Sequence, residues 1–120
     1  MNPSTALGNK VIIAVQRECP RARVFRRVVS NVHPIGQPHI IMEVGIKGQA
    51  DIWGFALSTG PRAVPFEIEL KVGRDRESEA QRNWRELCRS LGVPHLVLAA
   101  PDKNDFSKAV AEAVSFVKNL

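Results

Sequence analysis

The residue types that can do chemistry gather on three short segments of this chain. Along residues 65–72, apolar and charged side chains alternate with period two, which is typical of a β-strand. That alternation puts Glu69 and Lys71, two residues apart, on the same face of the strand. Asp51 begins an earlier apolar run behind a glycine turn, and Gln81 lies in the first turns of a later helix. Two carboxylates, an ammonium and an amide in this order suit the hydrolysis of a phosphodiester with a divalent metal ion.

Each of these residues has a candidate role. Asp51 and Glu69 are candidate ligands of Mg²⁺ or Mn²⁺, because such hard cations are held by one or two carboxylates and keep several waters. The backbone carbonyl of Leu70 is a further candidate oxygen ligand. Lys71 would orient the attacking water or offset charge in the transition state. Gln81 would position the water or the Lys71 ammonium, since an amide both donates and accepts hydrogen bonds.

Three other side chains lie near this group in the sequence. Glu67 shares the strand face of Glu69 and is a further ligand, a carboxylate beside the metal site or a solvent-facing side chain. Trp53 and Trp84 lie in apolar patterns, which predicts core positions, and a base-stacking role would require exposure. The three histidines are too scattered to predict a metal cluster.

The elements that must position these residues follow from hydrophobic periodicity and from the glycines and prolines. Helices are predicted over residues 5–18, 76–91 and 105–119, and strands over 22–31, 39–44, 51–57, 65–72 and 94–100. We assign the order αβββαβα to the fold, in which consecutive strands precede a helical crossover. This order predicts an α/β fold with a mixed sheet flanked by helices, in a single domain of residues 1–120.

Basic residues are concentrated near the beginning of the chain. The net charge is +5, and residues 1–30 alone carry six basic residues against one acidic residue. Residues 31–120 carry 11 basic and 11 acidic residues, a balance of zero. A basic segment is expected where a protein faces a polyanion, and Arg23, Arg26 and Arg27 are candidate contacts to phosphate. The alternative is an ordinary solvated strand edge.

Other function classes have less support. No apolar run approaches the ~18–20 residues of a membrane span, and the first residues lack the pattern of a secretory signal. Cys19 and Cys88 form neither a zinc motif nor a disulfide framework, which fits a reducing cytosol. We therefore expect a cytoplasmic protein with no membrane partner and no small-molecule cofactor.

Several motifs occur together and in a fixed order. They are GQADIWG at 48–54, FEIELK at 66–71, SEAQRNW at 78–84 and LG at 91–92, preceded by VFRR at 24–27. In this combination the chain resembles the VRR-NUC domain family of the PD-(D/E)xK nuclease superfamily, over roughly residues 9–100. The resemblance implies a restriction-endonuclease-like core, with Asp51 and Glu69 as metal-binding carboxylates and Lys71 as the catalytic lysine. Gln81 would be the family's glutamine on the following helix, and cleavage would leave a 5′-phosphate.

The resemblance also implies a substrate and a setting. Stand-alone VRR-NUC proteins of phages and bacteria resemble four-way-junction resolvases and tend to be homodimers, and two sites about a two-fold axis suit branched DNA. The chain departs from the family in its first helix, where Asn9 and Lys10 stand at the place of a common glutamate. Glu18 lies at the far end of that helix and is a poor substitute.

Three hypotheses remain open. The first is a metal-dependent DNA endonuclease that acts on branched or four-way-junction DNA inside a bacterial cell or a phage host. The second is a catalytically weak or inactive DNA-binding or recombination accessory protein, which the missing helix carboxylate favours. The third is a small interaction module whose Glu-x-Lys pair serves only solubility on an edge strand.

Overall fold

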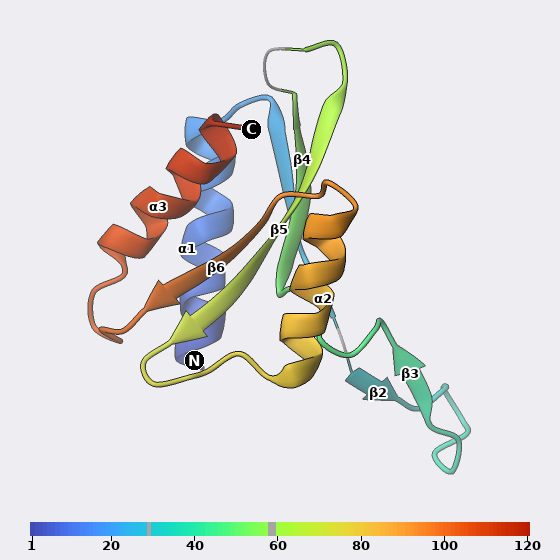
Figure 1. Cartoon of the computed structure of the whole chain (residues 1–120). Helices are drawn as coiled ribbons and strands as arrows, with labels where there is room; N and C mark the ends of the chain where they lie inside the picture. Colours follow the sequence, from blue (N-terminus) through green and yellow to red (C-terminus); the bar gives the residue numbers. More distant parts are fainter. Residues whose placement is uncertain (29, 58–59) are drawn as a thin grey trace.

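Four strands form the central sheet of the computed structural model, which describes residues 1–28, 30–57 and 60–120 (Figure 1). The elements are α1 (Pro3–Glu18), β1 (Ala22–Arg26), β2 (Ser30–Val32), β3 (Met42–Val44), β4 (Ile52–Leu57), β5 (Ala63–Val72), α2 (Glu79–Ser90), β6 (His95–Ala100) and α3 (Ser107–Lys118). The strand order is β1-β4-β5-β6. Strands β1, β4 and β5 are antiparallel neighbours, whereas β5 and β6 are parallel and joined through α2. The predicted α/β fold with a mixed sheet is therefore confirmed.

Helices lie on both faces of this sheet. Helices α1 and α3 run side by side over one face, and α2 lies on the other (Figure 1). Apolar side chains at alternate strand positions pack under α1 and α3; this buried cluster includes Leu7, Val11, Val15, Val24, Ile52, Phe66, Ile68, Leu70, Leu98, Ala113 and Val117. Burying a side chain of this size contributes roughly 1.5–3 kcal/mol, so this face holds the strands in register.

The opposite face of β5 is also buried, contrary to the simplest interpretation of its alternation. Glu67, Glu69 and Lys71 are only 8%, 2% and 7% exposed. Period-two alternation shows which side chains share a face, but it does not show what covers that face. Here α2 covers the charged side of β5, so these charges lie inside the protein.

Helix α2 begins at Glu79, three residues later than predicted. Ser78 is its N-cap, and its hydroxyl accepts a hydrogen bond from the backbone N–H of Gln81 at 3.1 Å. The Gln81 side chain in turn accepts from the Ser78 N–H at 2.8 Å. This reciprocal capping box fixes the start of the helix and holds the Gln81 side chain at its first turn.

The predicted order αβββαβα has three strands before α2, the predicted residue ranges give four, and the structure has five. The strand predicted over 22–31 ends at Arg26, and residue 29 within it lies outside the described residues. Strands β2 and β3 pair with each other in a separate hairpin that extends away from the main sheet (Figure 1). This hairpin and its flanks expose Val32, Ile35, Ile40, Ile41, Met42 and Ile46. Within the described residues, none of the helices is both long enough and apolar enough to cross a membrane.

Candidate active site

The structure brings Asp51 and Glu69 together across neighbouring strands. Ile52 on β4 pairs with Ile68 on β5, so Asp51, just before β4, lies opposite Glu69. The Asp51 Oδ2 atom accepts a hydrogen bond from the backbone N–H of Leu70 at 2.8 Å. Because the N–H and C=O groups of one strand residue point to the same edge, we expect the Leu70 carbonyl to face Asp51 as well.

Gln81 connects the other two predicted residues. Its Nε2 donates to Glu69 Oε1 at 3.0 Å, and its Oε1 accepts from Lys71 Nζ at 2.7 Å. Lys71 Nζ also lies 3.7 Å from Glu69 Oε1 and 3.6 Å from Asp75 Oδ2. All four residues singled out in the sequence therefore form one contiguous group, and Asp75 joins it through its ion pair with Lys71.

The glycine turn before Asp51 brings that loop against α2. Gly48 has a φ of +93°, a conformation that side chains with a Cβ rarely adopt. A Cβ at this position would also overlap the backbone carbonyl of Ala80, in the first turn of α2. Gly48 thus allows the Asp51 loop to approach the helix turn that carries Gln81.

The surroundings of Glu69 disfavour its ionised form. Its burial, followed by a hydrogen bond with the Asp51 carboxyl and the negative charge of that group, raises the pKa of Glu69 from 4.5 to about 9, and Lys71 opposes the shift. The ionised form leaves Oε2 without a hydrogen-bond partner among the described residues. The protonated form can instead donate to Asp51. Glu69 therefore needs either a proton or a cation.

These residues fit a hard divalent cation. Two carboxylates and one backbone carbonyl would leave the remaining positions to water, as Mg²⁺ and Mn²⁺ prefer. The buried, unpartnered Oε2 of Glu69 is the observation that carries this fit. Within residues 1–28, 30–57 and 60–120 there is no group of three or more His, Cys, Asp or Glu side chains suited to a metal; the site offers the pair Asp51 and Glu69.

Glu67 has a different environment from Glu69. Its Oε1 accepts from Arg27 at 2.7 Å and from the Trp84 indole at 2.8 Å, and its Oε2 lies 3.8 Å from the Cys88 thiol. Burial and the Glu67 charge raise the pKa of Cys88 to about 11, which keeps the thiol protonated. Both oxygens of Glu67 thus have partners within the protein, and through Trp84 and Cys88 the residue anchors α2 on β5.

The histidine beside this anchor is buried. His95 opens β6 opposite Glu67 and is 7% exposed, and burial lowers its pKa. Neither ring nitrogen has a hydrogen-bond partner in the described part of the chain.

The three candidate phosphate-binding arginines lie in different surroundings. Arg23 is exposed and donates to the carbonyls of Pro20 and Ala22 at 3.0 and 2.7 Å. Arg27 pairs with Glu67, and its guanidinium carbon lies 5.8 Å from the centre of the Trp53 ring. Arg26 lies toward α1 and donates to Asn9 Oδ1 at 2.8 Å.

The α1 residues near the position of the family's glutamate do not supply a carboxylate to this site. The Asn9 oxygen is engaged by Arg26, as above. Glu18 pairs with Arg17 at 3.5 Å at the C-terminal end of the helix. The departure from the family pattern therefore persists in the structure.

The prediction that Trp53 belongs to the core is wrong. Trp53 is 37% exposed, and its ring stacks on Phe25 with centroids 4.7 Å apart. Sequence reasoning also missed the adjacent Phe55. The signal was present in 52–57, where Ile52, Gly54 and Ala56 take the buried positions and the aromatic residues alternate with them. A fully apolar strand does not show which of its faces is covered.

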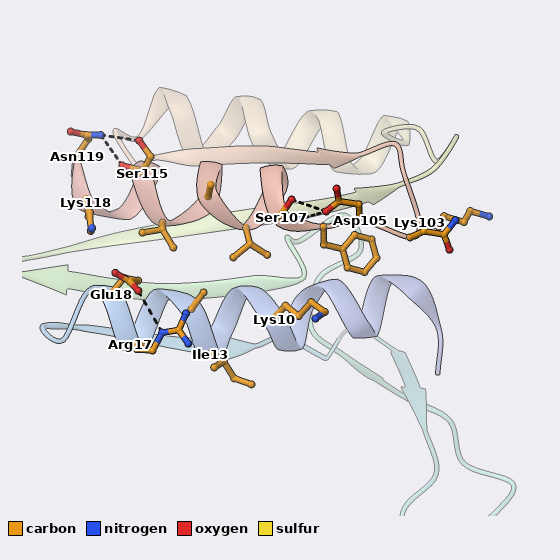
Figure 2. A pocket seen from close by; sticks show the side chains of 16 residues that line it. Lys10, Ile13, Arg17, Glu18, Lys103, Asp105, Ser107, Ser115, Lys118 and Asn119 are labelled. Carbon is orange, nitrogen blue, oxygen red and sulfur yellow. Dashed lines mark hydrogen bonds and ion pairs between the residues drawn. The ribbon is translucent and has the colours of Figure 1, made fainter.

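A cavity lies on the far side of the sheet. It measures about 1150 Å³ and runs between α1 and α3, with Lys10, Arg17, Lys103 and Lys118 around an apolar floor (Figure 2). None of the four residues of the candidate site lines it.

Comparisons with protein-family models, with curated proteins and with solved structures found no match for this chain. The family resemblance therefore depends on the ordered sequence motifs alone.

Proposed function

We propose that this protein is a metal-dependent DNA endonuclease whose site consists of Asp51, Glu69, Lys71 and Gln81. The observation that carries the proposal is the arrangement around Glu69. A buried carboxylate with an unpartnered oxygen lies beside Asp51, and Gln81 links it to the Lys71 ammonium. The ordered motifs of the VRR-NUC family run through the same four residues.

Each residue of the site has its own role in phosphodiester hydrolysis. A Mg²⁺ or Mn²⁺ ion held by Asp51, Glu69 and the Leu70 carbonyl would lower the pKa of a bound water and neutralise phosphate charge. Lys71 offsets the negative charge that develops in the transition state. Gln81 fixes the direction of the ammonium by accepting its hydrogen bond at 2.7 Å. By the family resemblance, the product carries a 5′-phosphate.

The burial of Glu69 and Lys71 argues against the interaction-module hypothesis. A pair that serves solubility belongs on a solvated edge strand, whereas β5 is a central strand and both side chains are less than a tenth exposed. Removing such charges from water costs several kcal/mol per ion. A chain that retains them in this position gains something other than solubility.

The accessory-protein hypothesis remains the second candidate, and one observation favours it. In α1 the position of the family's glutamate is taken by Asn9, whose oxygen is bound to Arg26. A nuclease site that lacks one carboxylate would bind its metal more weakly.

We further propose that the substrate is branched DNA, that the protein works as a homodimer, and that it acts in the cytoplasm of a bacterium or of a phage host. The exposed apolar side chains of the β2–β3 hairpin support a second copy as a partner, because monomers rarely expose a contiguous patch of this kind. The net charge of +5 supports the DNA partner.

A cleavage assay tests the proposal. A four-way junction, a flap and a plain duplex are incubated with the protein in Mg²⁺, in Mn²⁺ or in EDTA. We expect metal-dependent cutting that Glu69→Ala abolishes. Glu86→Ala, which removes an exposed carboxylate from α2, is the matched control and should cut like the wild type. Junction binding without any cutting in either metal would put the accessory protein first.

A further inference from the structure

Three aromatic side chains form an exposed platform on the sheet. Phe25 of β1 and Trp53 and Phe55 of β4 are 40%, 37% and 40% exposed. Phe25 stacks on Trp53 at 4.7 Å with an interplanar angle of 29°, and its ring centre lies 6.1 Å from that of Phe55. We call these three residues the aromatic platform.

The platform lies on the same sheet face as the candidate active site. Phe25 pairs with Trp53, and Trp53 pairs with Glu67, so these side chains share a row across the sheet. The next row along the strands holds Asp51 and Glu69. Two residues of a strand span about 7 Å. A bound polymer that lies on the platform therefore needs to extend only about 7 Å along the strands to reach the carboxylates.

The platform is open because α2 covers only the other half of this face. The helix packs on β6 and sends Trp84 to Glu67 on β5. Toward β1 and β4 the same face leaves three large rings partly in water. Exposed aromatic surface of this size is typical of a binding site rather than of a closed monomer.

Arginines lie on two sides of the platform, and one of them, Arg27, is paired with Glu67. The Arg27 guanidinium lies 5.8 Å from the centre of the Trp53 ring. On the far side of Phe55, Arg21 and Arg23 line a groove of about 540 Å³. No acidic residue lines this groove among the described residues. The groove, the platform and the carboxylates thus follow one another across a single face.

The exposed rings together with the arginines indicate which kind of molecule binds to this face. Aromatic rings beside a cationic track bind single-stranded nucleic acid, because bases stack on the rings while the phosphates meet the arginines. A second copy would bring the same patch against itself about a two-fold axis, and Arg21 and Arg23 would then face a partner surface with no acid to pair them. In an intact duplex the base faces are already stacked, so a plain duplex offers nothing to the rings.

We propose that Phe25, Trp53 and Phe55 stack the unpaired bases of a DNA strand, next to the site at which that strand is cut. The placement of the cut rests on the nuclease function proposed above, whereas the stacking itself does not. The substrate class then narrows to DNA with a single-stranded segment, such as a flap or an opened branch point.

Binding in EDTA tests the platform without requiring cleavage. A short oligothymidylate is titrated into the protein while tryptophan fluorescence is followed. We expect saturable quenching that weakens with added salt and disappears in Trp53→Phe, because Trp84 is partly buried and hydrogen-bonded. A blunt duplex should compete poorly with the oligothymidylate.

Affinity measurements on truncated variants test the rings themselves. Phe25→Ala or Phe55→Ala should each weaken oligothymidylate binding roughly 5- to 150-fold, as expected for the loss of one stacked base. Ile13→Ala, which removes an exposed apolar side chain from α1 on the other side of the sheet, should bind like the wild type. Circular dichroism and thermal melting ensure that each variant is folded.

Wild-type oligothymidylate affinity in folded Phe25→Ala and Phe55→Ala would overturn the platform. If these variants also shift from dimer to monomer in sedimentation, the three rings form a contact between copies instead. If the variants lose binding but the wild type cuts no DNA in either metal, the platform stands and the nuclease proposal fails. If the wild type cuts DNA and the variants bind oligothymidylate normally, the nuclease proposal stands and the platform fails.

Discussion

The Oε1 atom of Gln81 accepts hydrogen bonds from both Lys71 Nζ, at 2.7 Å, and the backbone N–H of Ser78, at 2.8 Å. One side-chain oxygen therefore closes the capping box of α2 and directs the ammonium of the candidate site. The start of the helix and the position of the lysine cannot vary independently. A glutamine is suited to this position because its amide nitrogen can donate to Glu69 at the same time.

Replacing Gln81 should affect activity more than stability. In Gln81→Ala the ammonium of Lys71 loses its acceptor and Glu69 loses a donor, so we expect cleavage to fall on the order of 100-fold, the effect of a misplaced catalytic group. Loss of the cap should lower the free energy of unfolding by about 1 kcal/mol. Initial cleavage rates in saturating Mg²⁺ and urea denaturation measure the two effects.

Ser78→Ala separates the cap from the lysine. It removes the hydroxyl that accepts from the Gln81 N–H but keeps the Gln81 side chain. We expect Ser78→Ala to lose about as much stability as Gln81→Ala but to cleave DNA at a near-normal rate. Equal loss of cleavage in both variants would mean that Gln81 acts only through the helix.

The stability of the metal-free protein should depend on the protonation of Glu69. The pKa of Glu69 is raised from 4.5 to about 9, so between these values the folded state binds a proton that the unfolded chain has released. The contribution of Glu69 is therefore fully present below about pH 4.5 and is lost as the pH rises through about 9. Glu69→Gln, which mimics the neutral form, should gain stability over the wild type as the pH rises.

Urea denaturation in EDTA at several pH values measures this difference. We expect the gain of Glu69→Gln to reach at least about 1 kcal/mol at the alkaline end, the equivalent of one pKa unit. Added Mg²⁺ should then stabilise the wild type and not the variant, because a cation replaces the proton. Parallel stability curves for the two proteins would show that Glu69 is ionised without a cation.

The sequence predicted the composition of the site better than its surroundings. Asp51, Glu69, Lys71 and Gln81 were identified from strand alternation and motif order, and they do lie together. The same alternation did not reveal that α2 buries the charged face of β5, because local periodicity carries no information on the packing of a distant element. The capping box and the burial of Glu69 therefore emerged only from the fold.

For Trp53 the sequence predicted burial, whereas the structure shows exposure. Residues 52–57 are all apolar, and such a run is compatible with burial on both faces. The structure leaves part of one face open because α2 packs on β6 and reaches β5 through Trp84, whereas Phe25 of β1 and Trp53 and Phe55 of β4 stay partly exposed. The strand predicted over 22–31 is likewise wrong in extent, because β1 ends at Arg26 and Ser30 belongs to β2 of the separate hairpin.

Gly48→Ala should loosen the contact between the Asp51 loop and α2. The φ of +93° strains any residue with a Cβ by roughly 1–2 kcal/mol, and the added methyl group would overlap the Ala80 carbonyl. We expect a loss of stability above the strain alone, and a loss of cleavage as Asp51 and Gln81 move apart. Gly92→Ala is the matched control, since its φ is +77° but nothing lies within 4 Å of the added Cβ. If both variants lose the same stability, the close approach to Ala80 is not important.

Glu67 should prove structural, although it shares a strand face with Glu69. Its partners Arg27 and Trp84 lie within 2.8 Å, and the Arg27–Glu67 pair is mostly buried. Arg27→Ala leaves a buried charge unpaired, which costs about 3–5 kcal/mol. Glu67→Gln, which keeps an acceptor for the Trp84 indole, should cost less and should retain the rise in melting temperature on adding Mg²⁺ or Mn²⁺. Asp51→Asn should abolish that rise. A loss of the metal-dependent shift in Glu67→Gln as well would make Glu67 a third carboxylate of the metal site and would account for the absence of one from α1.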